Sequence, residues 1–113
     1  MCGITCIISK ENSDISEEIL VSTNDLISHR GPDGEGFYYG ENFAFGHRRL
    51  AILDLSPDGH QPMHWKDKYV ITFNGEIFNY IEIRSDLIQQ GYTFHSQSDT
   101  EVILAAYDCW GED

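Results

Sequence analysis

Residues 1–9 read MCGITCIIS, and this stretch joins a candidate nucleophile to a candidate strand. The run from Gly3 to Ser9 is short and rich in β-branched residues, which predicts a strand buried on both faces. Cys2 then lies at the mouth of that strand. If Met1 is removed, the Cys2 thiol and a free α-amine share one residue, and the amine can accept the thiol proton near neutral pH. Taken alone, the stretch favours a plainer interpretation, in which position 2 merely tolerates a small residue.

The composition indicates one globular domain that acts on something other than a polyanion. Of the 113 residues, 41% are hydrophobic, and 19 acidic against 7 basic side chains give a formal charge of -12. That charge argues against nucleic acid or an anionic membrane as a partner. No stretch has the pattern of a signal peptide or a membrane span, so we expect a cytoplasmic protein. The three cysteines lack the spacing of a zinc site or a disulfide framework, and no metal is expected.

The first part of the chain predicts a helix, a loop and a hairpin. Apolar residues at helical spacing predict a helix over residues 16–27. Three glycines and a proline in HRGPDGEG, residues 29–36, predict a loop. Residues 37–39 and 43–46 then predict two strands joined by a three-residue turn.

The next segment carries two arginines toward the expected core. HRRLAILD, residues 47–54, predicts a buried strand that begins with Arg48 and Arg49 after a histidine. A guanidinium group at the edge of the core requires an anionic partner, so one of these arginines is a candidate ligand-binding residue. Residues 55–64 are turn-forming throughout and predict a second loop.

Residues 69–73, YVITF, predict a strand that stops at Asn74, Gly75 and Glu76. An Asn-Gly pair is typical of a hairpin turn. However, residues 80–90 have the pattern of a helix with a glycine stop, so the hairpin interpretation weakens. The strand end then offers backbone amides and a carboxamide side chain.

The end of the chain predicts a short strand over residues 92–94 and a helix over residues 100–110. Ser98 and Glu101 have the spacing of a capping box for this helix. Asp99 would lie in its first turn, where the helix dipole alone accounts for a carboxylate. Because no closing strand follows the helix, we expect the chain to be a fragment of a larger domain.

The histidines suggest no metal site. Their spacing fits no compact zinc pattern, and hydrogen-bonded or solvated side chains are the better expectation. His47, beside the two arginines, is the histidine that is hardest to dismiss as a functional residue. The others are His29, His60, His64 and His95.

Six ordered motifs together resemble one family. They are MCGI at the start, SHRGPDG at 28–34, HRRLAILDLS at 47–56, GHQPM at 59–63, FNGEIFNY at 73–80 and SDTEV at 98–102. Over essentially its whole length the chain resembles the glutaminase domain of asparagine synthase, a class II glutamine amidotransferase of the N-terminal-nucleophile hydrolase type.

The resemblance implies a role for each motif. Cys2 would attack the side-chain amide of glutamine, with its own α-amine moving the proton. The Asn74 side chain and the Gly75 backbone N–H would form the oxyanion hole. The other residues implied in substrate binding are Arg49 for the α-carboxylate, Glu76 and Asp99 for the α-ammonium group, and Leu50, Ala51, Ile52 and Leu53 along the pocket wall.

The resemblance also implies the fold and what lies beyond residues 1–113. The family has an α+β fold, a four-layer αββα sandwich of antiparallel sheets between helices, and this chain would hold only the N-terminal part of it. ATP and magnesium belong to a synthetase domain that the complete enzymes carry, and no cofactor is expected in this fragment. Incomplete sheets would expose edges and apolar surface.

Three functions stay open. The first is the glutaminase part of an asparagine synthase, whose ammonia amidates aspartate. The second is the same chemistry in an enzyme that amidates a sugar acid or another carboxylate. The third is an inactive ligand-binding or assembly module in which retained Met1 blocks the amine. The expected partners are glutamine and the protein's own C-terminal synthetase domain, while a homodimer stays open.

Overall fold

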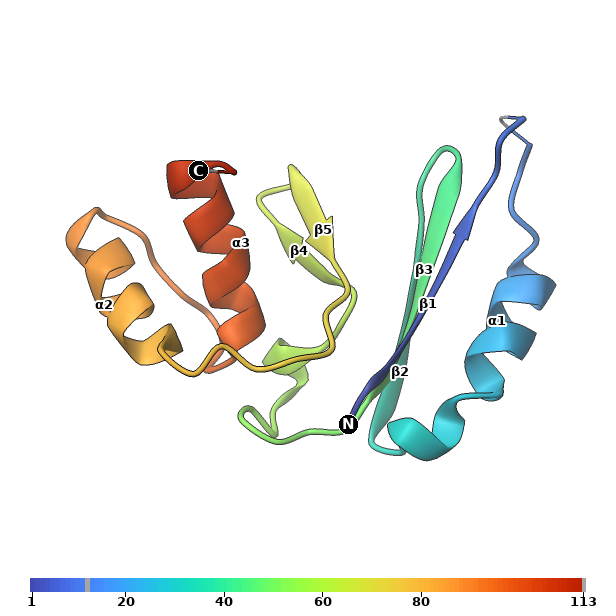
Figure 1. The fold of residues 1–113 in the computed structure, drawn as a ribbon, viewed down its shortest axis with the longest axis horizontal. Coiled ribbons are helices and arrows are strands. Elements are labelled where there is room, and N and C mark those ends of the chain that lie inside the picture. The colour runs from blue at the N-terminus through green and yellow to red at the C-terminus, as the bar shows by residue number, and fades with distance from the viewer. Residues whose placement is uncertain (12, 113) are drawn as a thin grey trace.

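The computed structural model describes residues 1–11 and 13–112, and its elements form two halves joined by residues 50–62 (Figure 1). The N-terminal half contains strands β1 (Gly3–Ile8), β2 (Gly34–Tyr39) and β3 (Phe43–Arg49) with helix α1 (Glu17–Asp25). The C-terminal half contains strands β4 (Met63–Trp65) and β5 (Tyr69–Ile71) with helices α2 (Tyr80–Gln89) and α3 (Asp99–Trp110). Short 3-10 turns span Ser28–Arg30 and Pro57–Gly59.

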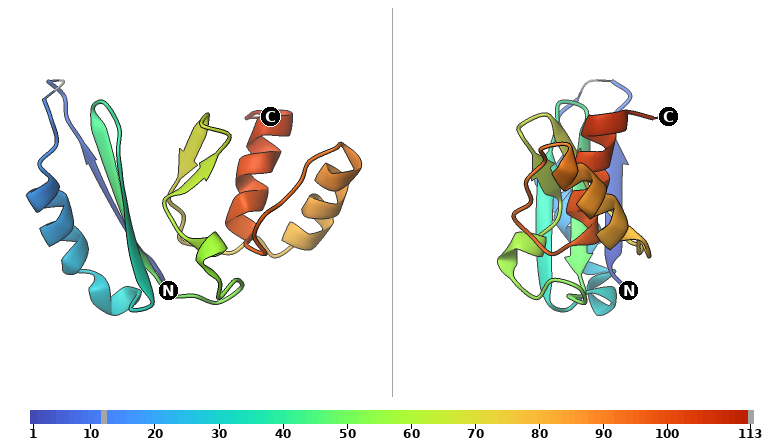
Figure 2. Two further views of the ribbon diagram at one scale, coloured as in Figure 1. Left: turned by 180° about the vertical axis from the view of Figure 1, so that it is seen from behind. Right: turned by 90° about the vertical axis from the view of Figure 1, so that its left-hand side faces the viewer.

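The elements are stacked in layers. Across Figure 1 they follow in the order α1, three-stranded sheet, β4–β5 hairpin, α3 and α2. Both sheets are antiparallel, so the structure is an α+β arrangement with sheets in the middle and helices outside. Seen from behind and from the side in Figure 2, the linking segment runs along the same end of the molecule as the N terminus.

The three-stranded sheet places the start of the chain beside the end of β3. The strand order is β1-β3-β2, and Gly3 pairs with Arg48 while Gly34 pairs with Arg49. Cys2 is therefore next to the residues that follow β3. The expectation that this first strand is buried on both faces was wrong: Thr5 is buried but Ile8 is 71% exposed, because only one face of β1 packs against α1.

Helix α1 packs on the sheet through a partly polar interface. It begins at Glu17 because the Ser16 side chain caps it by accepting from Ile19 N, and it ends at Asp25, before the predicted end at residue 27. Leu20 and Asn24 are its fully buried residues. A Cβ at Gly46 would lie 2.9 Å from Asn24 Oδ1, so glycine at this position of β3 makes room for the helix.

Two predicted boundaries near β3 were wrong because pairing extends strands through glycine and histidine. The strands predicted at 43–46 and 47–54 are one strand that ends at Arg49, and residues 50–54 form no strand. The predicted loop at 29–36 ends early, since β2 begins at Gly34 and pairs along its length with β3. The hairpin itself was confirmed.

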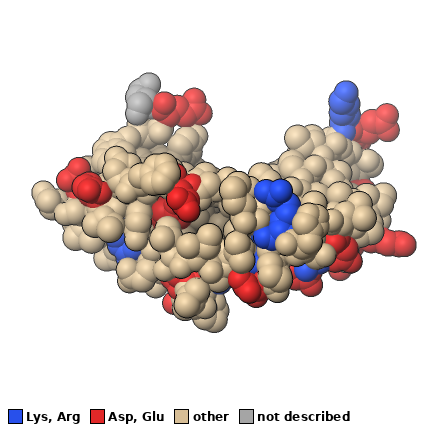
Figure 3. All heavy atoms as spheres, turned by 60° about the horizontal axis from the view of Figure 1, so that its bottom comes forward, with Lys and Arg blue, Asp and Glu red and all other residues tan. Residues whose placement is uncertain are grey.

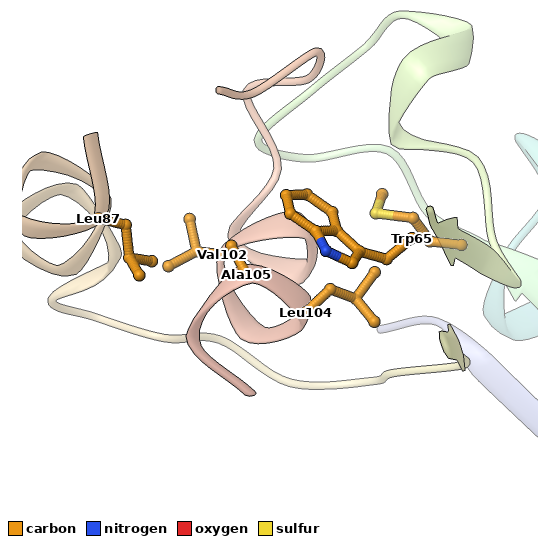
Figure 4. Packing of buried hydrophobic residues seen from close by; sticks show 6 residues of the cluster. Trp65, Leu87, Val102, Leu104 and Ala105 are labelled. Carbon is orange, nitrogen blue, oxygen red and sulfur yellow. The ribbon is translucent and has the colours of Figure 1, made fainter. Parts of the chain in front are cut away.

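The apolar core lies in the C-terminal half (Figure 4). In Figure 4, α3 lies in the middle and turns Val102 toward Leu87 of α2, while Trp65 of β4 packs on its other side. The helix predictions at 80–90 and 100–110 were confirmed, with α3 starting one residue earlier, at Asp99. The buried cluster consists of Met63, Trp65, Leu87, Val102, Leu104 and Ala105.

Three local predictions in this half were wrong. Strand β4 lies partly inside the predicted loop at 55–64, and residues 92–94 form no strand because Tyr92 and Phe94 pack singly against the core. Ser98 caps α3 as expected, accepting from Thr100 N at 3.1 Å. Glu101 does not complete the capping box, because its carboxylate accepts from Ser96 N, at 2.7 Å, and from nearby groups.

Candidate active site

A cavity of about 230 Å³ lies where the two halves meet, at the end of the molecule that holds the N terminus. Its walls come from segments far apart in the sequence: the first two residues, the segment after β3, the segment after β5 and the start of α3. All the predicted site residues except Ala51 line it, namely Cys2, Arg49, Leu50, Ile52, Leu53, Asn74, Gly75, Glu76 and Asp99.

Ala51 is held away from the cavity. Its backbone N–H donates to Asp33 Oδ2 at 2.9 Å, and Asp33 N in turn donates to Arg49 O at 2.9 Å. Asp33, in the HRGPDGEG motif, thus fixes the backbone that follows β3 through these two hydrogen bonds. Its role here is structural support of the cavity wall.

The Cys2 thiol is fixed against the backbone of Leu50. Leu50 N donates to Cys2 Sγ at 3.2 Å, and the thiol donates to Leu50 O at 3.6 Å. Arg30 Nε donates to the Cys2 carbonyl oxygen at 3.1 Å. The Cys2 nitrogen is in peptide linkage to Met1, which also lines the cavity. The sulfur is therefore positioned at the cavity while the nitrogen carries an acyl group.

Arg49 lines the cavity with part of its hydrogen-bonding capacity in use. One terminal nitrogen donates to Ser56 O at 2.8 Å and the other to Asp54 O. A guanidinium group has five N–H donors, so three remain for an anion. A Cβ at Gly59 would overlap the Arg49 guanidinium, which explains why the second loop carries glycine at that position.

Arg48 points to the other side of β3 and binds carboxylates of its own half. It pairs with Asp25 and with Glu35, the latter at 2.9 Å, and its Nε donates to Asn24 O at 3.2 Å. Alternation along the strand separates the two arginines. The resemblance assigned the substrate carboxylate to Arg49, and of the two arginines it is Arg49 that lines the cavity.

Asp99 is a buried carboxylate at the start of α3, with 5% of its surface exposed. Its Oδ2 accepts from Ile77 N at 2.9 Å, so Asp99 ties the end of the segment containing Asn74 and Gly75 to the helix. The second carboxylate oxygen is available to a cation. Glu76 lies on the same wall and is exposed.

Asp54 is a cavity residue that the sequence did not single out. Its carboxylate accepts from Ser56 N and from Gln97 N, both at 2.8 Å. Hydrogen bonding from Ser56, followed by that from Gln97, holds the pKa of Asp54 below its ordinary value in spite of burial. An ionised Asp54 therefore joins the segment after β3 to the turn before α3. An Asp-x-Ser turn was the available signal.

His47 is completely buried beneath the cavity wall. Burial lowers its pKa to about 4, and the nearby His60 and Arg49 act in the same direction, so the ring is neutral at pH 7. Within residues 1–11 and 13–112, no group of three His, Cys, Asp or Glu side chains could hold a metal ion. In the same part of the chain, no helix is long and apolar enough to cross a membrane.

Several other cavity residues were not predicted. Gly59 and Gln61 lie within the GHQPM motif, which marked them as part of a pattern but gave them no role. Figure 3 shows this end of the molecule, where acidic side chains are spread widely and basic ones are fewer. The full set that the sequence missed is Met1, Asp54, Gly59, Gln61, Phe73, Ser98 and Thr100.

Comparison with known proteins gives this arrangement a context. A family model described as the glutamine amidotransferase domain matches residues 1–113. Glutamine-hydrolyzing asparagine synthetase 1 of Bacillus subtilis is 45% identical over 118 residues, covering 100% of this chain and 18% of that protein. A putative glutamine-hydrolyzing asparagine synthetase 2 of Methanocaldococcus jannaschii is 42% identical over 132 residues, covering 100% of this chain and 25% of that protein.

A relative with a different name is also similar. Amidase chry2 of Gibberella zeae is 36% identical over 124 residues, covering 98% of this chain and 18% of that protein. The chain thus spans a quarter or less of the length of these curated relatives.

Proposed function

The chain belongs to the glutamine amidotransferase domain family, and on that premise we propose that it hydrolyses the side-chain amide of glutamine to glutamate and ammonia. Amide hydrolysis needs a nucleophile, donors for the developing oxyanion and groups that hold the substrate. The observation that supports this function most strongly is that one cavity brings together the Cys2 thiol, the Asn74–Gly75 segment after β5, Arg49 and Asp99.

The proposed reaction begins once Met1 is removed. The α-amine of Cys2 takes the thiol proton, and the sulfur attacks the amide carbon of the glutamine side chain. Negative charge moves to the amide oxygen, toward which the Asn74 side-chain NH2 and the Gly75 N–H donate. The C–N bond breaks, ammonia leaves with the proton held by the α-amine, and a γ-glutamyl thioester remains. Water then adds to the thioester carbon, releasing glutamate and the thiol.

The charged ends of glutamine would fix its orientation. Arg49 keeps three N–H donors for the α-carboxylate after its bonds to the two loop carbonyl oxygens. Asp99, buried and hydrogen-bonded through one oxygen, would accept the α-ammonium group with the other, assisted by Glu76. The substrate amide would then lie between the Cys2 sulfur and the Asn74–Gly75 segment.

We also place the fold within the N-terminal-nucleophile hydrolase type, as the first part of its four-layer αββα sandwich. The layer order in Figure 1, with helices outside two antiparallel sheets, supports this assignment. Residues 1–113 would form the N-terminal part of that domain.

The use of the ammonia is a second proposal. The names of the Bacillus and Methanocaldococcus relatives support transfer to aspartate in a C-terminal synthetase domain that would bind ATP and magnesium outside residues 1–113. A second candidate is that the ammonia amidates another carboxylate, since a relative similar over nearly the same stretch, Amidase chry2, is not named as an asparagine synthetase. Both candidates require the same glutaminase chemistry at Cys2.

Glutamine hydrolysis by the full-length protein tests this function. Intact mass first establishes that Met1 is absent, and glutamate and ammonia release are then measured. We expect Cys2→Ala to abolish both, because no other thiol lines the cavity among the described residues. Cys6→Ala is the matched control, since Cys6 lies exposed on the same strand, outside the cavity lining, and should keep full activity. Turnover in Cys2→Ala, or glutamine binding without hydrolysis in the processed wild type, would contradict the proposal.

A further inference from the structure

Two buried side chains hold the backbone of Phe73, the residue directly before Asn74. Phe73 N donates to Gln61 Oε1 at 2.6 Å, and Phe73 O accepts from His47 Nε2 at 3.3 Å. Strand β5 ends at Ile71, so neither bond belongs to a sheet ladder. The Phe73 carbonyl is part of the peptide group that contains Asn74 N. The orientation of Asn74 is therefore set by side chains from elsewhere in the chain.

His47 is committed to this contact. A carbonyl oxygen only accepts, so the ring carries its proton on Nε2. The ring is fully buried and neutral, and its Nδ1 has no hydrogen-bond partner within the described residues. Burying an imidazole with one nitrogen unpaired costs stability, which the single bond to Phe73 only partly offsets. Its single partner is the backbone before Asn74.

Gln61 is committed in the same way. It is 7% exposed, and while its Oε1 accepts from Phe73, its Nε2 donates to Thr100 Oγ1 at 3.2 Å. Thr100 follows Asp99, whose carboxylate holds Ile77 N. The segment from Phe73 to Ile77 is consequently held at both ends by groups linked to the start of α3.

The glycine-rich strand β2 makes room for this arrangement. Gly36 pairs with His47 in the β2–β3 register. A Cβ at Gly36 would overlap Gln61 O and would lie 2.6 Å from His60 Nε2. Gly36, in the second half of the HRGPDGEG motif, therefore leaves space for the backbone of Gln61 beside His47, its neighbour on the paired strand.

We propose that His47 and Gln61 are positioning residues that clamp Phe73 and so aim the Asn74 and Gly75 donors at the reacting amide. This inference rests on the proposed glutamine hydrolysis. The clamp touches neither the sulfur nor the charged ends of glutamine, which contact Arg49, Glu76 and Asp99 in the proposed complex. Its loss should thus weaken transition-state stabilisation while leaving substrate binding in place.

The first test measures kcat and KM of the full-length protein. Gln61→Met removes both side-chain bonds at similar size, and we expect kcat to fall about 10- to 100-fold with KM changed less than about threefold. Thr72→Val is the matched control. Thr72 directly precedes Phe73, and its buried hydroxyl has no hydrogen-bond partner within the described chain.

The second test asks whether the clamp acts through Asn74. If Gln61 works by aiming the donors, the effects of Gln61→Met and Asn74→Ala on kcat should be clearly less than multiplicative, because only the Gly75 N–H is left to aim in the Asn74→Ala background. His47→Phe is measured in the same way, and urea unfolding checks that each variant folds. A wild-type rate in Gln61→Met, or effects of Gln61→Met and Asn74→Ala that multiply, would overturn the clamp while leaving glutamine hydrolysis intact. Absence of turnover in the processed wild type would instead remove the proposed function itself.

Discussion

The two halves of the molecule are built differently. In the C-terminal half, α2, α3 and β4 share a buried cluster of six apolar side chains. In the N-terminal half, the buried interior of the described residues includes Asn24, His47 and Thr5 beside Leu20 and Ala44. The C-terminal half therefore contains most of the hydrophobic stabilisation. The N-terminal half supplies Cys2 and Arg49 to the cavity, and among the described residues it buries fewer large apolar side chains.

Polar contacts fix the N-terminal half and the joining segment against the C-terminal half at the cavity. His47 reaches Phe73, Asp54 reaches Gln97, and Gln61 links Phe73 to Thr100. Hydrogen bonds are directional, whereas apolar packing tolerates sliding. Such a junction suits a site whose nucleophile comes from one half and whose oxyanion donors come from the other.

The largest expected effect is on the rate of glutamine hydrolysis, when a proposed oxyanion donor of the C-terminal half is removed. Asn74→Ala should lower kcat for glutamine hydrolysis by roughly 100-fold or more, since one oxyanion donor is lost. Its matched control is Asn79→Ala, because Asn79 is exposed before α2 and makes no side-chain capping bond. Equal activity of the two variants would show that Asn74 is not an oxyanion donor.

A pair of truncations tests the difference in packing. Leu87→Ala should lower the free energy of unfolding by about 2–5 kcal/mol, because Leu87 is fully buried in the cluster. Ile8→Ala in β1 should change it by about 0.5 kcal/mol or less, since Ile8 is 71% exposed. Urea unfolding followed by circular dichroism measures both. Similar losses would contradict the burial of Leu87 in the C-terminal cluster and the exposure of Ile8 on β1.

The buried histidine makes the junction sensitive to acid. The pKa of His47 is lowered from 6.5 to about 4, so between these values the unfolded chain binds a proton that the folded chain does not. Stability attributable to His47 is thus lost as the pH falls from about 6.5 toward 4. His47→Gln should flatten this part of the stability profile. A wild-type slope in that variant would contradict the neutral, buried assignment.

The smallest effect is expected on the surface of the C-terminal half. Lys68 Nζ lies 2.8 Å from Asp108 Oδ1, and this pairing is the main reason that the pKa of Lys68 is raised. Because the lysine is 57% exposed, water screens the pair. Lys68→Met should leave the urea midpoint within experimental error. A loss comparable with that of Leu87→Ala would show that this half relies on charge as well as packing.

The sequence was most informative where signals are local. Helices α2 and α3 follow from spacing of apolar residues and from glycine stops, and Gly91 and Gly111 do have positive φ. The ordered motifs gave Cys2, Arg49, Asn74 and Asp99 roles in the site, but they gave none to other lining residues such as Asp54 and Gln61. Such signals lie within a few consecutive residues.

What the sequence could not supply depends on partners distant in the chain. Strand β4 lies among turn-forming residues and exists because Met63 pairs with Ile71. Tyr92 lies in a stretch that predicted a strand, but its ring stacks on Trp65 with the two ring centroids 6.3 Å apart. Gln61 and His47 contact Phe73 across 12 and 26 residues, and no local pattern reports such bonds.

In the proposed reaction Cys2 is a nucleophile that attacks glutamine in the cavity lined by both halves. Intact-mass analysis after incubation with a diazoketone analogue of glutamine tests it most directly. We predict a protein without Met1 that gains one adduct at Cys2, with the adduct suppressed by excess glutamine and absent in Cys2→Ala. Processed protein that stays unmodified, or that is modified equally in the presence of glutamine, would contradict the account.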